Sequence, residues 1–300
     1  MSSDAATWLA NLAYTKLVGT ALPARLFGPP APAVTAPVAA RPVRLEIVAH
    51  CWRYAHMLRF QLSSLALHPP TRLALAYTLY HAEDDAETAA LAARFGAREV
   101  PGVEWRWRPV PRERLLRRAI GRNEAALASA ADWLWFADCD LIFHAGCLDS
   151  LAPALESSRE PLLYPADESI TALLADDHPL LAGGRAWRGG DGGRDLVDID
   201  PALFAPNRIE KAKGAFQIVR GDVARAVGYC RDLALYQRPT DRWRKTYEDT
   251  AFRRLLGTEG VPVAIDALYR IRHREKGRYG DAPGAGPLRA RVRRWRDALR

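Results

Sequence analysis

From Val43 onward, short apolar segments alternate with amphipathic ones. The apolar runs have the length of buried strands, whereas the segments between them place apolar residues three and four positions apart, as in helices. Strands are expected at 43–49, 73–80, 103–107 and 133–137, and helices at 54–68, 88–96 and 111–131. Alternation of this kind is typical of βαβ units. We therefore expect an α/β fold with a mainly parallel sheet and helices on both faces.

The second half of the chain is less regular. Six glycines lie between residues 183 and 193, a stretch that is either a lid over a bound ligand or a plain surface insertion. After it we expect strands at 215–219, 261–265 and 269–271, a helix that starts near Thr246 and a terminal helix from about Pro287.

Changes in composition divide the chain into three parts. Residues 1–42 combine a short helical pattern at 5–22 with a Pro- and Ala-rich linker. Residues 43–280 carry the alternating pattern and are expected to form one domain, and residues 281–300 form a basic helix. No stretch is as long and as apolar as a membrane span, and Asp4 and Lys16 do not fit a signal peptide.

Composition excludes a mainly disordered chain, because 49% of the 300 residues are hydrophobic and 26% are charged. The four cysteines form no CxxC pair, which argues against a zinc ribbon or a dense disulfide framework and favours a reducing compartment. We therefore expect a cytoplasmic protein.

The net charge of +8 is local. Residues 270–300 hold eleven basic and three acidic residues, so residues 1–269 sum to zero. A nucleic-acid partner is therefore not expected. The helix at 287–300 has an apolar stripe among its arginines and either docks on the domain or makes peripheral contact with an anionic inner membrane face.

Glycine spacing excludes the common nucleotide-binding loops. No glycine occurs between Gly28 and Gly96, so the first strand is followed by neither a dinucleotide fingerprint nor a P-loop. The GxSxG and HExxH motifs are also absent. A nucleotide would have to be held by a metal, by arginines or by backbone groups at strand ends.

Two carboxylates follow the fourth expected strand directly. In an extended chain Asp138 and Asp140 would project from the same face at the carboxyl edge of the sheet. Carboxylate oxygens there suit Mn²⁺ or Mg²⁺ carrying a diphosphate. The alternative is a turn at the strand end in which one Asp caps a backbone amide and the other faces solvent.

The helix before this strand contains Gly121, Arg122 and Asn123. An Arg-Asn pair in a helix, followed by an apolar strand and D-x-D, resembles the donor-binding core of GT-A-fold glycosyltransferases, most closely the family-2 type. The resemblance runs in order over roughly residues 43–275. It implies a GT-A fold with a nucleotide-sugar-binding half at 43–145 and an acceptor-binding half at 146–280. It also implies that Asp138 and Asp140 bind the metal and donor, near Arg122 and Asn123.

Three further segments match the family less closely. Glu83, Asp84 and Asp85 follow the second strand, at the place where members of the family bind the nucleoside. The alternative is that these acids lie at a helix N-terminus, where the helix dipole favours them. His273 occupies the place of an imidazole metal ligand, or is a solvated histidine in a basic run. For His50, at the end of the first strand, a structural role is expected rather than ligand binding.

The expected reaction needs a base that accepts the proton of the acceptor hydroxyl. The resemblance assigns this role to Asp249, with Glu248 beside it. Thr246 followed by Asp249 is also a capping-box pattern, which requires no catalysis. Lys213, before the strand at 215–219, lies where such enzymes shape the sugar and acceptor pocket.

The leading hypothesis is a metal-dependent, inverting glycosyltransferase of the hexosyltransferase type. It would use Mn²⁺ or Mg²⁺, a nucleotide-sugar donor, with UDP-sugars favoured, and a saccharide, lipid or small-molecule acceptor. A sugar nucleotidyltransferase is a second hypothesis, although the glycine-rich loop of that class is missing. A basic module that binds nucleic acid or membrane is a third.

Overall fold

The computed structural model describes residues 42–175, 177–185, 196–241 and 247–273. Seven strands form a central sheet in the order β10-β6-β9-β4-β1-β2-β3, and all are parallel except β9. These strands are β1 (Val43–Cys51), β2 (Leu73–Ala82), β3 (Val103–Val110), β4 (Trp133–Phe136), β6 (Leu162–Pro165), β9 (Gln217–Arg220) and β10 (Val261–Val263).

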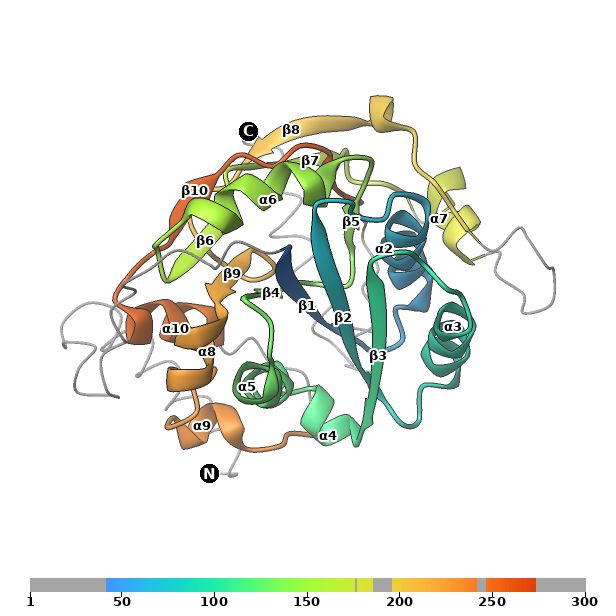
Figure 1. Ribbon diagram of the computed structural model, residues 1–300. Helices are drawn as coiled ribbons and strands as arrows, with labels where there is room; N and C mark the ends of the chain where they lie inside the picture. The colour runs from blue at the N-terminus through green and yellow to red at the C-terminus, as the bar shows by residue number, and fades with distance from the viewer. Residues whose placement is uncertain (1–41, 176, 186–195, 242–246, 274–300) are drawn as a thin grey trace, which may run out of the picture.

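Helices cover both faces of this sheet, with α2 and α3 on one side and α4, α5 and α8 on the other (Figure 1). The helices are α2 (Ala55–Leu67), α3 (Ala86–Gly96), α4 (Arg112–Leu115), α5 (Arg118–Ala128), α6 (Cys147–Ser157), α7 (Pro179–Arg185), α8 (Gly221–Val227), α9 (Ala234–Gln237) and α10 (Glu248–Leu256), with a 3₁₀ turn η3 (Pro201–Leu203). The predicted α/β fold with a mainly parallel sheet flanked by helices is confirmed.

A second, smaller sheet has the order β5-β11-β7-β8. Its strands are β5 (Leu141–Phe143), β7 (Asp167–Thr171), β8 (Phe204–Arg208) and β11 (Leu268–Arg270). The chain passes from the first sheet to the second through the turn that contains Asp138 and Asp140. This short connection brings the acidic turn between the two sheets.

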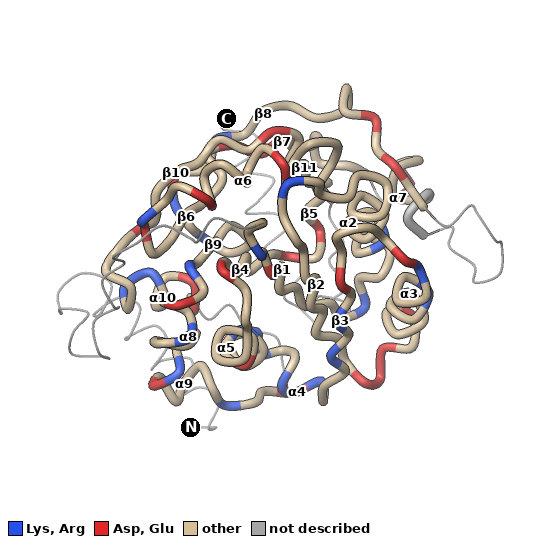
Figure 2. Tube along the Cα trace, in the orientation of Figure 1, with Lys and Arg blue, Asp and Glu red and all other residues tan. Residues whose placement is uncertain are grey.

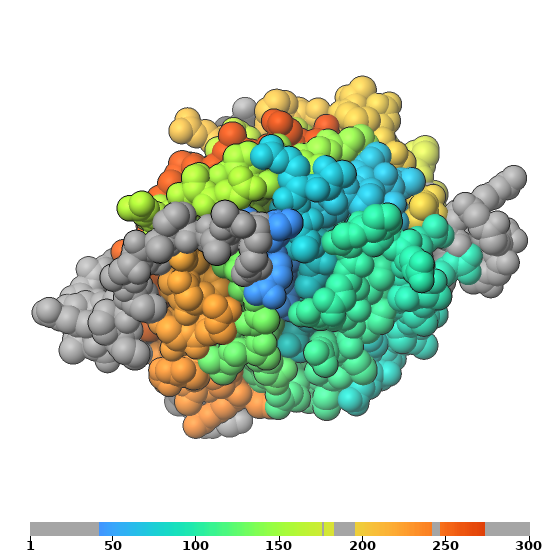
Figure 3. Space-filling view, in the orientation of Figure 1, coloured from blue at the N-terminus to red at the C-terminus, as the bar shows by residue number. Residues whose placement is uncertain are grey.

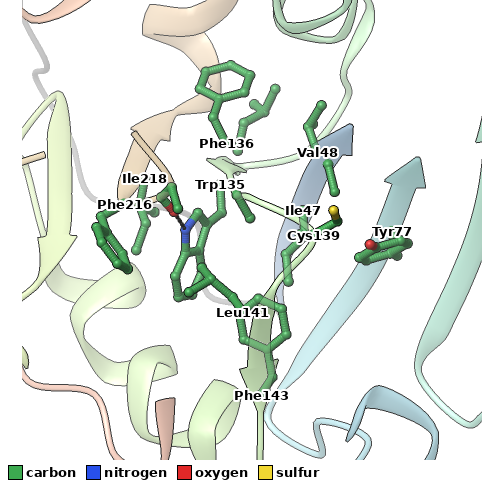
Figure 4. Packing of buried hydrophobic residues seen from close by; sticks show 14 of the residues in the cluster. Ile47, Val48, Tyr77, Trp135, Phe136, Cys139, Leu141, Phe143, Phe216 and Ile218 are labelled. Atoms are coloured by element: carbon green, nitrogen blue, oxygen red, sulfur yellow. Dashed lines mark hydrogen bonds between the residues drawn. The ribbon is translucent and has the colours of Figure 1, made fainter. Parts of the chain in front are cut away.

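Strands β1 and β4 are the centre of the fold. They pair in parallel with Val48 opposite Phe136, and the side chains of β4 are fully buried. Figure 4 shows Trp135 directed at the segment before β9, where its indole nitrogen donates to the carbonyl of Ala215 at 2.7 Å. Phe143 of β5 packs edge-on against the same indole with ring centroids 5.2 Å apart. Residues of both halves of the chain therefore share one core.

The order of the strands creates a topological switch point. From β1 the chain moves outward to β2 and β3, and it then returns to place β4 on the opposite side of β1. Helices of the two crossovers lie on opposite faces, so the loops after β1 and β4 separate at the carboxyl edge of the sheet. Ligands of open α/β sheets bind at such switch points. Asp138 and Asp140 lie at this one.

Most of the expected elements are present at close to the expected positions, but the helix predicted over 111–131 is divided. Helix α4 ends at Leu115 and α5 begins at Arg118. Between them the buried Arg117 leaves helical backbone geometry, and its Nε donates to the carbonyl of Arg238 at 3.2 Å. The break places Arg118 in the first turn of a new helix.

Several expectations fall on residues outside the described ranges: the N-terminal helix and linker before residue 42, most of the glycine-rich stretch, Thr246 and the basic terminal helix.

All four cysteines are free. Acidic and basic positions are interspersed over the described elements (Figure 2), in keeping with the zero net charge of residues 1–269. In the space-filling view α5 lies directly beside α8 and α9 (Figure 3). Within the described ranges, no helix has the length and apolar character that crossing a membrane requires.

Candidate functional site

The acidic pair lies in a turn, so the prediction of an extended chain at Asp138 and Asp140 is wrong, and the convergence of their carboxylates on one ligand stays a prediction. The amide of Leu141 donates to the carbonyl of Asp138 at 3.3 Å, and Asp140 lies inside this turn. The amide of Gln61 on α2 holds the turn, donating to the carbonyls of Asp138 and Leu141 at 3.0 and 2.9 Å. The chain must turn here because it leaves one sheet and enters the other. Asp138 is consequently part-exposed, whereas Asp140 is buried.

Arg118 connects the acidic turn with the predicted base segment. Its Nη1 lies 2.5 Å from Asp138 Oδ1, and its Nε lies 3.7 Å from Glu248 Oε1. Burial alone would lower the pKa of Arg118, but the carboxylates of Asp138 and Glu248 outweigh it and raise that pKa above its ordinary value. Asp138 and Glu248, which are 110 positions apart in the sequence, therefore both lie beside the positively charged side chain of Arg118.

Replacing Arg118 by methionine should lower the free energy of unfolding by about 2 kcal/mol, because it removes the charge-assisted hydrogen bond to a part-buried carboxylate. Arg112→Met is the matched control, since Arg112 pairs with the exposed Asp84 at 3.5 Å. That exposed pair should contribute about 0.5 kcal/mol or less. Urea unfolding of the two variants tests the difference, and equal destabilisation would contradict it.

Asp249 lies in the first turn of α10 and is linked to another loop. Its Oδ2 accepts a hydrogen bond from the amide of Gly214 at 3.1 Å and lies 3.6 Å from Nη1 of Arg253. Gly214 has φ +56°, a backbone conformation that favours glycine. Lys213 precedes it and is exposed. The structure thus brings the predicted Lys213 and Asp249 together at one loop.

The capping-box alternative depends on Thr246, two residues before helix α10. Helix α10 begins after Tyr247, which has φ +57° and makes no side-chain cap hydrogen bond. The Asp249 carboxylate accepts a hydrogen bond from the amide of Gly214, 35 residues away. Thr246 lies outside the described residues.

Arg122 and Asn123 lie behind this loop and support it. Arg122 is fully buried, and its guanidinium donates to Tyr229 Oη at 2.8 Å and to the carbonyl of Gly214 at 3.3 Å. Asn123 accepts from the amide of Tyr229 at 3.0 Å. Tyr229 in turn donates to Gln217, whose amide reaches the carbonyl of Asp249 at 3.2 Å. The Arg-Asn pair therefore positions the Asp249 segment, and direct contact with a donor stays a prediction.

Gly121 allows α5 to approach the ends of β1 and β2. A Cβ atom at this position would lie 2.5 Å from Nε2 of His50, whose ring stacks on Tyr80 with centroids 5.0 Å apart. Burial lowers the pKa of His50, and the charges of Arg122 and Arg118 lower it further. His50 is thus a neutral, packed histidine, as the structural interpretation expects.

The acids after β2 have different surroundings. Asp85 is the N-cap of α3: its carboxylate accepts from the amide of Thr88 at 3.2 Å and from the amide of Arg53 at 2.6 Å. The helix-terminus alternative therefore holds for Asp85. Glu83 and Asp84 are exposed at the same edge of the sheet, and their contact with a nucleoside stays a prediction.

His273 is buried, which rules out the alternative of a solvated histidine. Its Nε2 is hydrogen-bonded to Tyr54 Oη, and its ring lies 5.8 Å from that of His56, between centroids. Among the described residues, Asp138, Asp140 and His273 do not form a group whose ligand atoms all lie within 4.8 Å of one another. A metal held by all three would require these side chains to move.

Sequence reasoning missed Arg118 in this site. Arg118 lies four residues before Arg122 on α5, and this helical spacing was the available signal. Arg270 forms a two-point ion pair with the buried Glu168, with Nε 2.9 Å from Oε2. Burial alone would lower its pKa, but Glu168 and, more weakly, Asp140 and Asp138 raise it. The acidic turn thus lies in the field of two arginines from different elements.

No protein-family model and no curated protein matches the sequence. Among solved structures, the chain is similar to the mannosyltransferase PcManGT from Pyrobaculum calidifontis in complex with GDP-Man and Mn²⁺. That likeness has 15% identity and a TM-score of 0.47, over 97% of this chain and 70% of that chain. It is also similar to S. aureus TarS 1-349, with 12% identity and a TM-score of 0.44, over 76% of this chain and 60% of that one. Both scores are below 0.5, so the roles of individual residues rest on the geometry above.

Proposed function

We propose that this protein is a metal-dependent glycosyltransferase that moves a hexosyl group from a nucleotide-sugar, with UDP-sugars favoured, to an acceptor hydroxyl with inversion. The observation that carries the proposal is Arg118, which bonds Asp138 at 2.5 Å and lies 3.7 Å from Glu248 at the switch point of the sheet. Asp138 and Glu248, separated in the sequence, therefore lie beside one arginine at this switch point.

The residues present suit a hard divalent cation such as Mn²⁺ or Mg²⁺. Asp138 and Asp140 offer carboxylate oxygens, and Gln61 fixes the turn that carries them. Between them, a hydrogen bond to Cys51 and burial raise the pKa of the Cys139 thiol well above its ordinary value, which favours the protonated thiol. When bound, the cation would offset charge on the donor diphosphate.

Arg118 and Arg270 would both stabilise the donor diphosphate. As the bond between the anomeric carbon and the phosphate oxygen breaks, the leaving nucleoside diphosphate takes the electron pair and gains negative charge. Arg118 and Arg270 stay protonated, since neighbouring carboxylates raise both pKa values. They would stabilise this charge without having to acquire a proton first.

Asp249 would act as the base. The acceptor oxygen forms the new bond to the anomeric carbon while its proton passes to the Asp249 carboxylate. The amide of Gly214 fixes one oxygen of that carboxylate, and the buried Arg122 fixes the carbonyl of Gly214. Glu248 and the exposed Lys213 would complete the pocket wall on this side. The four free cysteines suit a reducing compartment.

A thermal-shift panel tests the proposal. UDP, GDP, UDP-sugars and single-stranded oligonucleotides are added with and without Mn²⁺. One nucleoside diphosphate should raise the melting temperature by several degrees, about 5 °C at 100 times its Kd, and only when Mn²⁺ is present. Stabilisation by oligonucleotides alone would contradict the transferase and favour a nucleic-acid-binding module.

A further inference from the structure

Two histidines and an aspartate converge away from the acidic turn. His68 follows the end of α2, His144 follows β5, and Asp198 belongs to the segment before η3. His144 Nε2 lies 3.4 Å from Asp198 Oδ1, and His68 Nε2 lies 3.8 Å from Asp198 Oδ2. One ligand atom from each residue can be chosen so that all three lie within 4.8 Å of one another.

These separations fit ligands around one small cation. Zinc binds imidazole nitrogen and carboxylate oxygen at about 2.0–2.2 Å, so its tetrahedral ligands are about 3.3 Å apart. His68 Nε2 is shielded from solvent, and its 3.8 Å distance to Asp198 exceeds an ordinary hydrogen bond. The two imidazole rings are close, with centroids 4.3 Å apart and a tilt of 54°. An ion pair alone leaves the buried nitrogen of His68 without a hydrogen bond.

The cluster offers two imidazoles and one carboxylate as ligands. A neutral imidazole presents the lone pair that a metal requires. The two imidazole rings beside one carboxylate are thus suited to bind one metal cation from solution.

All three residues are held by the same part of the fold. The amide of Val197, next to Asp198, donates to Ser63 Oγ on α2 at 3.1 Å. The amide of Phe143, next to His144, donates to Ser64 Oγ at 3.0 Å, and the ring of Tyr269 lies edge-on to His144. The side chains are therefore preorganised rather than on independent loops.

We propose that His68, His144 and Asp198 form a second metal site, which binds a zinc-class transition ion with a fourth position open to water. Two imidazoles and one carboxylate favour Zn²⁺ over Mg²⁺, which prefers oxygen ligands. The site is separate from the acidic turn, because Gln61, which holds that turn, lies seven residues before His68, about 10 Å along a helix. The ion would fasten the segment around Asp198 to α2 and β5.

The test uses untagged full-length protein stripped of metal with a chelator. Titration with Zn²⁺ followed by calorimetry should give one strong site, and Zn²⁺ should raise the melting temperature by about 5 °C. Cobalt should give the visible absorption bands of a tetrahedral ion. His144→Ala and Asp198→Asn should each weaken zinc binding by at least about 100-fold. His178→Ala, which removes a similarly part-buried histidine outside the cluster, should leave it unchanged.

Two outcomes would overturn the site: no zinc bound by the intact protein, or zinc bound by both variants as tightly as by the unaltered protein. Asp198 is half exposed, so Asp198→Asn keeps the test decisive even if His144→Ala fails to fold. This inference does not rest on the transferase proposal. The double variant Asp138→Asn/Asp140→Asn should retain the zinc site, which separates a failure of one proposal from a failure of the other.

Discussion

Replacement of Asp249 by asparagine is expected to lower kcat by about 10²–10⁴-fold, because the variant has no base to accept the proton of the acceptor hydroxyl. Donor affinity should stay within about a factor of two, since the amide oxygen of asparagine can still accept from Gly214. Steady-state rates measured with excess donor and a responsive acceptor, together with calorimetry of nucleotide binding, separate the two effects.

Asp222→Asn is the matched control for this variant. Asp222 also lies in the first turn of a helix beside an arginine, with Arg220 Nε 3.1 Å from its Oδ1, but it belongs to α8. Its replacement should leave kcat unchanged. If Asp249→Asn turned over at the normal rate, the base would have to be another residue, and Glu248, which is buried beside Arg118, would be the next to test.

The sheet could be predicted from local patterns because its central strands are buried on both faces. The continuous apolar run of β4 and the mainly apolar β1, which also carries Arg44 and Glu46, have few alternative structures, and their order along the chain implies parallel pairing. The division between α4 and α5 could not be predicted in this way. It depends on a bond from Arg117 to the carbonyl of Arg238, 121 residues away, and no local pattern contains that partner.

The candidate site, too, could be predicted only where a local sequence pattern indicates it. Asp138, Asp140 and Asp249 could be found because each lies in a short, recognisable segment. The turn geometry around Asp138 depends on Gln61 from α2, and the bridging role of Arg118 depends on Glu248. His68, His144 and Asp198 are 76 and 54 positions apart in order and share no motif. Only tertiary structure brings such residues together.

Arg122 was identified from the sequence, and the structure shows which groups its side chain contacts. The sequence resemblance associates it with the donor, yet its side chain is fully buried and bonds Tyr229 and Gly214. A buried guanidinium that holds a glycine carbonyl can set the position of the neighbouring amide, which here bonds Asp249. Its effect on catalysis would therefore pass through the backbone of Gly214.

Replacement of Asp138 or Asp140 by asparagine is expected to weaken Mn²⁺-dependent nucleotide binding by about 100-fold or more, because each variant removes a charged oxygen ligand at the diphosphate position. Asp138→Asn also alters the ion pair with Arg118. Calorimetric titration of UDP with and without Mn²⁺ measures the effect. Binding without metal should be the same for the variants and the unaltered protein.

Asp132→Asn provides the matched control, because Asp132 precedes β4 whereas Asp138 and Asp140 follow it. Asp132 accepts from the amide of Arg44 at 2.9 Å at the opposite edge of the sheet, and asparagine can keep that bond. The control should bind nucleotide and Mn²⁺ normally. If both variants of the acidic pair kept full metal-linked affinity, the cation would have to bind elsewhere, and the acidic turn would serve only to connect the two sheets.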